Sequence, residues 1–210
     1  MIIGMVNQKG GVGKTTLSIN IADCIARCTE SRVLLIDADK QGSAIAWINA
    51  RSDKAKFTVI GLASDQIHKQ IDDIAKDYDH VIIDAPAQLG RFAQSIIRSS
   101  DVVIIPVKPS PADVWAADDV INLCEQAHDI NKNLKYFFAV NQKIQKTAIG
   151  QSIKKSLAAY SAGILDSEIM NRVVFATSFN DGQSVFDIDA SSAASKEILA
   201  MTNEILEKAQ

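Results

Sequence analysis

The sequence has few of the features that mark secreted, membrane or metal-binding proteins. It contains three cysteines, Cys24, Cys28 and Cys124, with no Cys-x-x-Cys spacing. An odd count without that spacing indicates reduced thiols packed as small buried residues. No apolar run approaches the roughly 18 residues that a membrane-spanning helix requires. The N-terminal stretch MIIGMVNQKG lacks a basic segment followed by a long apolar one. We therefore expect a cytoplasmic protein.

An excess of either charge is also missing. The chain has 22 lysines and arginines against 25 aspartates and glutamates, a formal net charge of −3. A weakly negative net charge does not indicate nucleic-acid binding. Any contact with a phosphate backbone must therefore come from a local cationic patch. Hydrophobic residues make up 47% and charged residues 22%, as in ordinary soluble globular proteins. The 210 residues suffice for one domain with a hydrophobic core.

Short apolar runs alternate with helical patterns along the chain. Leu17, Ile21 and Ile25 recur every four residues, as on the buried stripe of a helix. Strands alternating with helices predict an α/β fold with a mostly parallel sheet flanked by helices on both faces, and we expect residues 1–210 to form a single domain. The expected strands cover residues 2–6, 32–37, 80–84, 101–107 and 136–141, and the other expected helices cover about 43–51, 64–77, 91–98, 112–128, 147–161 and 190–208.

A glycine-rich loop follows the first expected strand. Residues 7–16 read NQKGGVGKTT, and a strand before such a loop with a helix after it is the setting of a phosphate-binding P-loop. The usual pattern G-x-x-x-x-G-K-[ST] fails at one position, because Gln8 stands where the first glycine belongs. Lys9 is a second lysine that the pattern does not need. A dinucleotide-binding fingerprint fails as well, since Thr16 stands where glycine or alanine is required.

The loop residues predict how a nucleoside triphosphate is held. Glycines allow backbone conformations that aim successive N–H groups at phosphates, and the following helix adds the positive end of its dipole. Lys14 would reach the β- and γ-phosphates. Thr15 would offer its hydroxyl to Mg²⁺, and Thr16 would lie nearer the α-phosphate.

Three aspartates stand at the ends of expected strands. Asp37 and Asp39 lie two apart in LLIDADKQG, and Asp84 ends VIID. The carboxyl ends of parallel strands are where ligands bind in such sheets. Carboxylates beside a triphosphate require Mg²⁺ between them, because like charges repel. An aspartate at a strand end also serves as a helix cap or turn residue, and both interpretations stay open.

Three motifs together resemble the deviant Walker-A ATPases of the ParA/MinD group: KGGVGKTT, LLIDADKQGS and HVIIDAPA. The resemblance continues more weakly through DVVIIPVKPSPADVWAA and SFNDGQSVFD. The length, and an N-terminus without a DNA-binding extension, resemble the small ParA proteins of plasmid partition. The resemblance implies a P-loop NTPase fold, ATP and Mg²⁺ as cofactors, and slow ATP hydrolysis.

The resemblance also answers why one phosphate loop holds two lysines. It implies that Lys9 reaches across an ATP-bound sandwich homodimer to the phosphates of the partner subunit, where its charge stabilises the transferring phosphoryl group. Asp39 would orient or activate the attacking water. The catalytic residues would then be Lys9, Lys14 and Asp39. The ATP-binding residues would be Lys9, Gly10, Gly11, Val12, Gly13, Lys14, Thr15, Thr16 and Asn141.

The same resemblance suggests the metal and adenine contacts. Asp37 and Asp84, together with Thr15, would hold Mg²⁺, partly through water. Asn141 would contact adenine. Lys40 departs from the family pattern, which commonly has proline at this position, so this loop is either more mobile or brings a lysine to phosphate or DNA.

A run of lysines suggests a DNA contact. Residues 130–160 contain no acid but six lysines: Lys132, Lys135, Lys143, Lys146, Lys154 and Lys155. Such a run can be a solvated helix face or a surface that contacts the phosphate backbone without reading bases. The resemblance adds Arg172, and a dimer would double the patch, so we expect nonspecific, nucleoid-associated DNA binding. The candidate DNA contacts are Lys143, Lys146, Lys154, Lys155 and Arg172.

Partners and rival functions follow from the same reasoning. A ParB-like protein or another cargo adaptor would stimulate hydrolysis through a basic N-terminal peptide, and the cargo could be a plasmid, a chromosome, or a protein assembly such as a chemotaxis cluster or carboxysome. A MinD-like membrane switch is disfavoured, because the polar face of SKEILAMTNEILEKAQ leans acidic, so we expect no membrane contact. An iron protein of the nitrogenase type would need cluster cysteines that are missing, and the three histidines, His68, His80 and His128, show no ligand spacing. A small-molecule ligase stays open and would differ by fast turnover.

Overall fold

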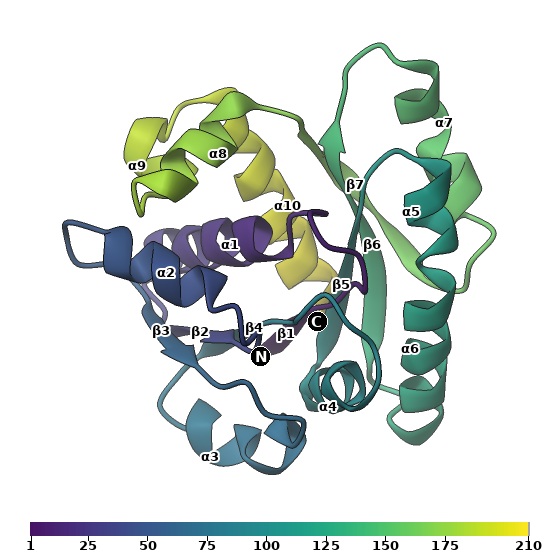
Figure 1. Ribbon diagram of the computed structural model, residues 1–210, viewed down its shortest axis with the longest axis horizontal. Coiled ribbons are helices and arrows are strands. Elements are labelled where there is room, and N and C mark those ends of the chain that lie inside the picture. The colour runs from purple at the N-terminus through teal and green to yellow at the C-terminus, as the bar shows by residue number, and fades with distance from the viewer. Residues whose placement is uncertain (210) are drawn as a thin grey trace.

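A single parallel sheet organises residues 1–209, the part of the chain that the computed structural model describes, with all side chains except those of residues 149 and 151. The strand order is β3-β2-β4-β1-β5-β6-β7, and every neighbouring pair runs parallel (Figure 1). This confirms the predicted fold class. The strands are β1 (Ile2–Met5), β2 (Val33–Asp37), β3 (Thr58–Gly61), β4 (His80–Asp84), β5 (Val102–Val107), β6 (Lys135–Lys143) and β7 (Gly163–Met170).

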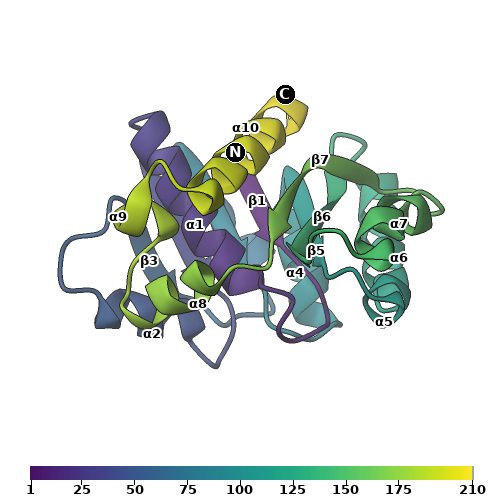
Figure 2. The same cartoon turned by 90° about the horizontal axis from the view of Figure 1, so that it is seen from above.

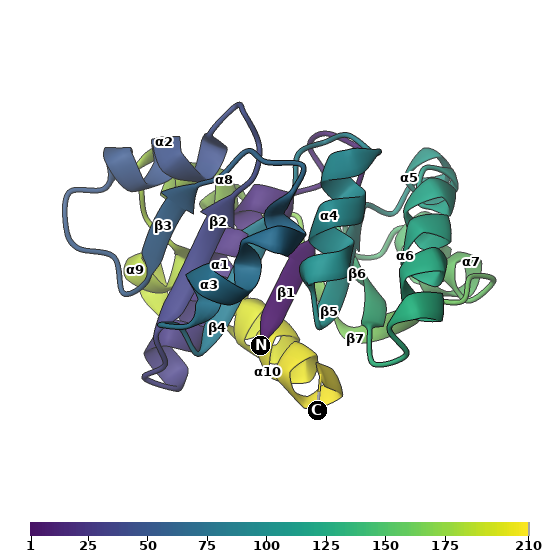
Figure 3. The ribbon, with the colours of Figure 1, turned by 90° about the horizontal axis from the view of Figure 1, so that it is seen from below.

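Helices cover both faces of the sheet. Residues of α1, α2, α9 and α10 share one buried apolar cluster with one face, and α8 packs against it. Residues of α3, α4, α6 and α7 share the other cluster (Figure 3). The helices are α1 (Lys14–Cys28), α2 (Ser43–Ala50), η1 (Ile67–Lys69, a 3₁₀ turn), α3 (Ile71–Ala75), α4 (Arg91–Ser99), α5 (Pro111–Trp115), α6 (Asp118–Ile130), α7 (Ala148–Leu157), α8 (Val173–Asn180), α9 (Val185–Asp189) and α10 (Ala193–Ala209).

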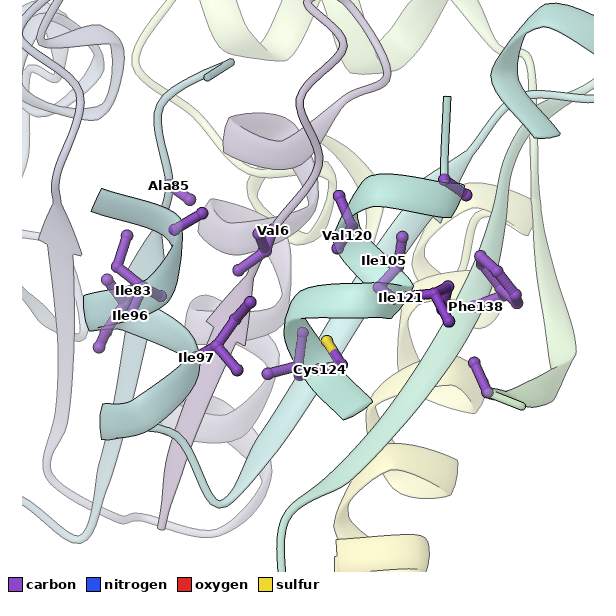
Figure 4. Close-up of a cluster of buried hydrophobic side chains, with 14 of the residues drawn as sticks. Val6, Ile83, Ala85, Ile96, Ile97, Ile105, Val120, Ile121, Cys124 and Phe138 are labelled. Carbon is purple, nitrogen blue, oxygen red and sulfur yellow. The ribbon is translucent and has the colours of Figure 1, made fainter. Parts of the chain in front are cut away.

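The central strands are buried on both sides, which explains their continuous apolar runs. In β2, Val33 and Leu35 join the cluster with α1 and α10, whereas Leu34 and Ile36 join the cluster with α3 and α4. Successive residues of a strand point to opposite faces, so a strand covered on both faces must be apolar at every position. Figure 4 shows the second cluster, where Ile97 lies close to the strand side chains. The five predicted strands are confirmed because each carries this pattern.

The two strands that the sequence did not predict lie at the edges of the sheet. β3 and β7 are edge strands, and each is only partly buried. In β7 the polar residues Asp166 and Glu168 interrupt the apolar run, so the pattern of a buried strand never forms. The short helices α8 and α9 were also missed. Two helices expected as continuous are divided: 64–77 into η1 and α3, and 112–128 into α5 and α6.

The C-terminal helix packs inward. Ile198, Met201 and Ile205 of α10 are fully buried in the cluster with α1. This is the packing expected from its apolar stripe. No helix in residues 1–209 is long and apolar enough to cross a bilayer.

The cysteines match the expectation in part. Cys24 and Cys124 are buried, and burial raises the pKa of each thiol to about 12. Cys28 is exposed, which corrects the expectation that all three are buried. It ends α1, beyond the part of the helix that faces the sheet.

A group of ion pairs fastens α9 to the two helices beside it. Asp187 accepts hydrogen bonds from Arg27 of α1 and, at 2.7 Å, from Nη1 of Arg51, which follows α2. Asp187 also forms a capping box with Ser184 at the start of α9. Burial alone would raise the pKa of Asp187, but the hydrogen bonds from Arg51 and the Ser184 N–H, together with the two arginine charges, lower it to about 2. The ionised carboxylate therefore stabilises the fold.

We predict that Asp187→Asn lowers the free energy of unfolding by about 2 kcal/mol at pH 7, the value of a pKa lowered from 3.8 to about 2. Because the folded-state pKa is depressed, this contribution is present above pH 4 and disappears as the pH falls towards 2. Urea unfolding of both proteins at pH 7, 4 and 3 measures the difference. Glu207→Gln, an exposed change in α10, is the control. A constant gap across this pH range would contradict the assignment.

Candidate nucleotide site

A pocket of about 560 Å³ opens at the carboxyl ends of the central strands. In Figure 2 the loop after β1, drawn in purple, lies between α8 and α5. Gly10, Gly11 and residues 13–17, from this loop and from α1, form the floor. Asp39, Ser43, Ala85 and Ala87 border one side. The opposite wall consists of Asn141, Gln142, Met170, Asn171, Arg172, Phe175, Ala176, Phe179 and Asn180.

The glycine loop is held open by its backbone and by β6. Gly13 has φ 92°, a conformation that side chains disfavour, and it directly precedes α1. A Cβ atom there would lie 2.2 Å from Nδ2 of Asn141. That amide donates a hydrogen bond to the carbonyl of Val12 (2.7 Å), and Nε2 of Gln142 donates to the carbonyl of Gly11 (3.1 Å). Asn141 therefore fastens the loop, a role that the sequence did not suggest.

The two lysines of the loop point to different places. Lys14 lines the pocket, is almost fully buried, and donates from Nζ to the carbonyl of Lys9 at 3.0 Å. Burial lowers the pKa of Lys14, and the charges of Asp84 and Asp39 oppose that shift. Lys9 is not among the described residues that line the pocket. Its ammonium lies 3.4 Å from a carboxylate oxygen of Asp113 in α5.

Gln8 has a structural role in the place of the missing glycine. Its Nε2 donates to the carbonyl of Ala116 at 2.7 Å and lies 3.2 Å from Oδ2 of Asp119. Ala116 directly follows α5, and Asp119 lies in the first turn of α6. Glycine could make neither contact, so this departure from the usual pattern ties the loop to the helices after β5.

A hydroxyl and a buried carboxylate meet beneath the loop. Oγ1 of Thr15 donates to Asp84 at 2.6 Å, and the Ser18 hydroxyl donates to the other carboxylate oxygen at 3.4 Å. Burial raises the pKa of Asp84 to about 7, helped by the nearby charge of Asp37 and opposed by the Thr15 hydrogen bond. A buried carboxylate beside a threonine hydroxyl is a donor set that suits Mg²⁺, whose charge would compensate the buried anion. The residues present fit the expected metal.

Asp37 lies beside Asp84 in the sheet register, but its carboxylate is engaged elsewhere. One oxygen accepts the N–H of Asp39, and the other accepts the N–H groups of Ala44 and Ile45 in the first turn of α2. The helix-cap interpretation thus describes this residue in the structure. Asp39 borders the pocket, and its Oδ1 accepts the N–H of Gln41.

The lysine run does not form the free cationic patch that the sequence suggested. Lys143 pairs with Glu168 at 2.5 Å, and Lys154 lies 3.7 Å from Asp166. Arg172 borders the pocket and pairs with Glu197 at 2.6 Å. Lys132 likewise pairs with Asp129. The partner acids come from β7, α10 and the end of α6, outside the interval 130–160, so the absence of acids within that interval was misleading.

Two of the candidate DNA contacts remain exposed. Lys146 and Lys155 are solvent-exposed and make no ion pair within residues 1–209. Lys146 precedes α7, and Lys155 lies in its last turn. This helix and α1 pack against opposite faces of the sheet. The cationic surface around α7 is therefore smaller than the sequence implied.

The wall made by α8 was missed from sequence. Phe175 and Phe179 face the pocket from this helix, and Gln142 reaches the glycine loop from the end of β6. Gln142 has φ 53°, an uncommon conformation for a residue with a side chain. The available signal was the pair Phe175 and Phe179, spaced four apart in VVFATSFN, which places both on one face of a helix.

Comparisons with known proteins agree with this geometry. A family model described as the CobQ/CobB/MinD/ParA nucleotide binding domain matches residues 3–201. The chain is 30% identical over 208 residues to the maintenance of carboxysome distribution protein A of Halothiobacillus neapolitanus, covering 97% of this chain and 95% of that protein.

Two solved structures have the same fold. The MinD cell division protein of Aquifex aeolicus matches with a TM-score of 0.79 at 23% identity, covering 98% of this chain and 96% of that one. A putative plasmid partition protein of Borrelia burgdorferi bound to AMPPNP matches with a TM-score of 0.80 at 19% identity, covering 99% of both chains.

We predict that Gly13→Ala destabilises the nucleotide-free protein by about 2 kcal/mol, because alanine is strained at this φ and its Cβ would displace Asn141. Gly10→Ala is the matched control in the same loop, since a Cβ there meets nothing within 4 Å. Chemical unfolding of both variants without nucleotide measures the difference. Equal stability of the two variants would show that Asn141 does not clamp the loop.

Proposed function

Because the chain belongs to the CobQ/CobB/MinD/ParA family of nucleotide-binding proteins, whose ParA and MinD members are ATPases, we propose that it is a ParA-type ATPase with an ATP-dependent dimer. The ATP-bound form is a sandwich homodimer. It binds nonspecific DNA and positions a cargo through slow hydrolysis that a partner protein stimulates. The whole chain acts as one P-loop ATPase domain.

The separation of the two lysines carries this proposal. Lys14 and Thr15 line the pocket, and the Thr15 hydroxyl donates to Asp84 beneath it, so one nucleotide would bind there. Lys9 belongs to the same loop but extends out of the pocket towards α5. A lysine that points away from the pocket of its own subunit is placed to act on a nucleotide held by another. Dimerisation then places two nucleotides between two copies of the loop.

Each residue of the pocket has a proposed task. The N–H groups of the glycine loop and the ammonium of Lys14 bind the phosphates. Thr15 and Asp84 would hold Mg²⁺, and Asp37 would support them mainly by fixing the start of α2. When bound, the metal would neutralise negative charge on the phosphates. Asp39, at the border of the pocket, orients the attacking water, and Lys9 of the partner subunit stabilises charge on the transferring group.

The adenine end of the pocket lies near α8. Phe175 and Phe179 offer aromatic surfaces there, which suit the face of a base. Asn141, expected to contact adenine, donates one amide N–H to the carbonyl of Val12, so its second amide N–H and its Oδ1 stay available to a nucleotide. Residues Lys9 to Thr16 complete the proposed ATP contacts.

DNA binding rests on fewer residues than the sequence suggested. Lys146 and Lys155 are the exposed members of the candidate set, and Lys143, Lys154 and Arg172 would have to leave their acidic partners to contribute. Two subunits double the exposed charge, so ATP-driven dimerisation would strengthen a weak contact with the phosphate backbone. The ATP-bound dimer would then be nucleoid-associated in the cytoplasm.

Partition of a plasmid or chromosome by a ParB-like partner is the first candidate cargo role. Positioning of a protein assembly is the second, and the similarity over nearly the whole chain to a carboxysome distribution protein favours it. The buried stripe of α10 argues against a membrane-associated switch of the MinD type. A gene for a small DNA-binding protein beside this one would indicate partition, and an operon for a protein assembly would indicate the second role.

We predict that Lys14→Ala and Lys9→Ala fail at different steps. Lys14→Ala should lose ATP binding, because the ammonium that faces the phosphates is gone. Lys9→Ala should bind ATP as a monomer but form no ATP-dependent dimer. Isothermal titration for binding and sedimentation for mass, both with Mg²⁺, separate the two. A Lys9→Ala protein that dimerises normally with ATP would count against the proposed role of Lys9.

We predict that Asp39→Ala binds ATP, dimerises and stays bound to nonspecific DNA, while turnover falls by at least about 100-fold, as expected when the residue that orients the nucleophile is removed. Phosphate release and fluorescence anisotropy with duplex DNA at 50 and 200 mM salt measure the two properties. Normal hydrolysis by this variant would exclude Asp39 as the residue that orients water. DNA affinity independent of ATP and salt would exclude the proposed DNA switch.

A further inference from the structure

The two residues that distinguish this glycine loop from an ordinary P-loop reach the same short helix. Gln8 donates to the carbonyl of Ala116, which ends α5, at 2.7 Å. The ammonium of Lys9 lies 3.4 Å from Oδ2 of Asp113, in the middle of α5. Both contacts join positions more than 100 residues apart in the sequence, so α5 is coupled to the loop that holds the phosphates.

Asp113 is an unusual partner for the partly exposed Lys9, because the Asp113 side chain is buried. Its side chain is 4% exposed, whereas that of Lys9 is 36% exposed. Oδ2 also accepts a hydrogen bond from the Ser110 hydroxyl, and Oδ1 has no hydrogen-bond partner among the described residues. Lys9 therefore provides the only ion pair that the structure shows for this carboxylate within residues 1–209.

We propose that Asp113 is a positioning residue that holds Lys9 away from the phosphates until a second ATP-bound subunit competes for it. This inference rests on the proposed function, in which Lys9 serves the nucleotide of the partner subunit. The ammonium cannot contact Asp113 and a distant phosphate at once, so the dimer forms only after this ion pair breaks. The strength of the pair thereby sets the ATP concentration at which dimerisation begins.

Release of Lys9 also has a consequence for α5. A buried carboxylate that loses its cation is strongly disfavoured, so α5 must shift until Asp113 finds water or another donor. The helix is short and is capped by Ser110. Besides Lys9, the bond from Gln8 to the carbonyl of Ala116 and the bond from the Tyr160 hydroxyl to the carbonyl of Val114 hold it. Trp115, 71% exposed, lies on the same helix. The surface beside the loop therefore changes with the nucleotide state.

The first test measures the ATP requirement of dimerisation. Asp113→Asn keeps the shape of the side chain and its acceptor for Ser110 but removes the charge that holds Lys9. We expect the ATP concentration for half-maximal dimerisation to fall about tenfold, the effect of about 1.4 kcal/mol. Asp113→Glu, which keeps the charge, should restore a requirement close to that of the unchanged protein. Asp72→Asn, an exposed acid in the first turn of α3, is the control and should have no effect.

The second test needs neither ATP nor a dimer. Acylation of lysine amines, quantified by mass spectrometry of the nucleotide-free protein, measures how accessible Lys9 is. Lys9 should react several times faster in Asp113→Asn than in the unchanged protein, whereas exposed Lys40 should react equally in both. If Asp113→Asn does not fold, Asp113→Ser replaces it, because this smaller side chain removes the same charge and Ser110 still caps α5.

The outcomes separate this inference from the proposed function. Unchanged labelling of Lys9 together with an unchanged ATP requirement would overturn the positioning role of Asp113. Faster labelling of Lys9 with no ATP-dependent dimer in any protein would support the contact and reject the proposed dimer cycle. A lower ATP requirement in both Asp113→Asn and Asp113→Glu would indicate a structural effect on α5 and would also overturn the inference.

Discussion

The attachment of the glycine loop to its two flanks is the constraint on which the rest of the site depends. On one flank, Asn141 and Gln142 at the end of β6 bind the carbonyls of Val12 and Gly11. On the other flank, Gln8 and Lys9 bind α5. The two amides satisfy the carbonyls of Val12 and Gly11 and so fix the backbone conformation that decides where the N–H groups of the loop point. The loop is therefore shaped before any nucleotide arrives.

The chemistry of the site follows from a second feature, the burial of charge beneath the loop. Asp84 is 1% exposed and its pKa is raised to about 7, and Lys14 is nearly as buried with its pKa lowered. Both shifts work against the fold, because a buried charge without full compensation is unfavourable. A bound metal and a polyphosphate would compensate these charges. Functional sites often retain such groups at a cost in stability, since the same burial strengthens their interactions with a ligand.

The sequence predicted the parts of the molecule that depend on local patterns. β2 and β5 are apolar at nearly every position because helices cover both faces, and the P-loop is recognisable because Gly13, Lys14 and Thr15 must be contiguous. The edge strand β7 escaped notice because Asp166 and Glu168 interrupt its apolar run.

The predictions from charge patterns were wrong for a different reason. Lys143 and Arg172 appeared free because Glu168 and Glu197 lie 25 residues further along the chain. The contact of Lys9 with Asp113, across 104 residues, was equally invisible. Ion pairs join residues that are distant in the sequence and depend on the tertiary fold. Burial patterns can be recognised because they involve neighbouring residues.

The central claim is that Lys9 of one subunit serves the nucleotide of the other, and mixing two inactive variants tests it most directly. A Lys9→Ala subunit binds ATP but offers no lysine, and a Lys14→Ala subunit offers Lys9 but binds no ATP. Steady-state phosphate release is measured for each variant and for an equimolar mixture. The account predicts turnover in the mixture well above that of either variant alone. Turnover by Lys9→Ala alone at the rate of the unchanged protein, or a mixture as inactive as its components, would contradict it.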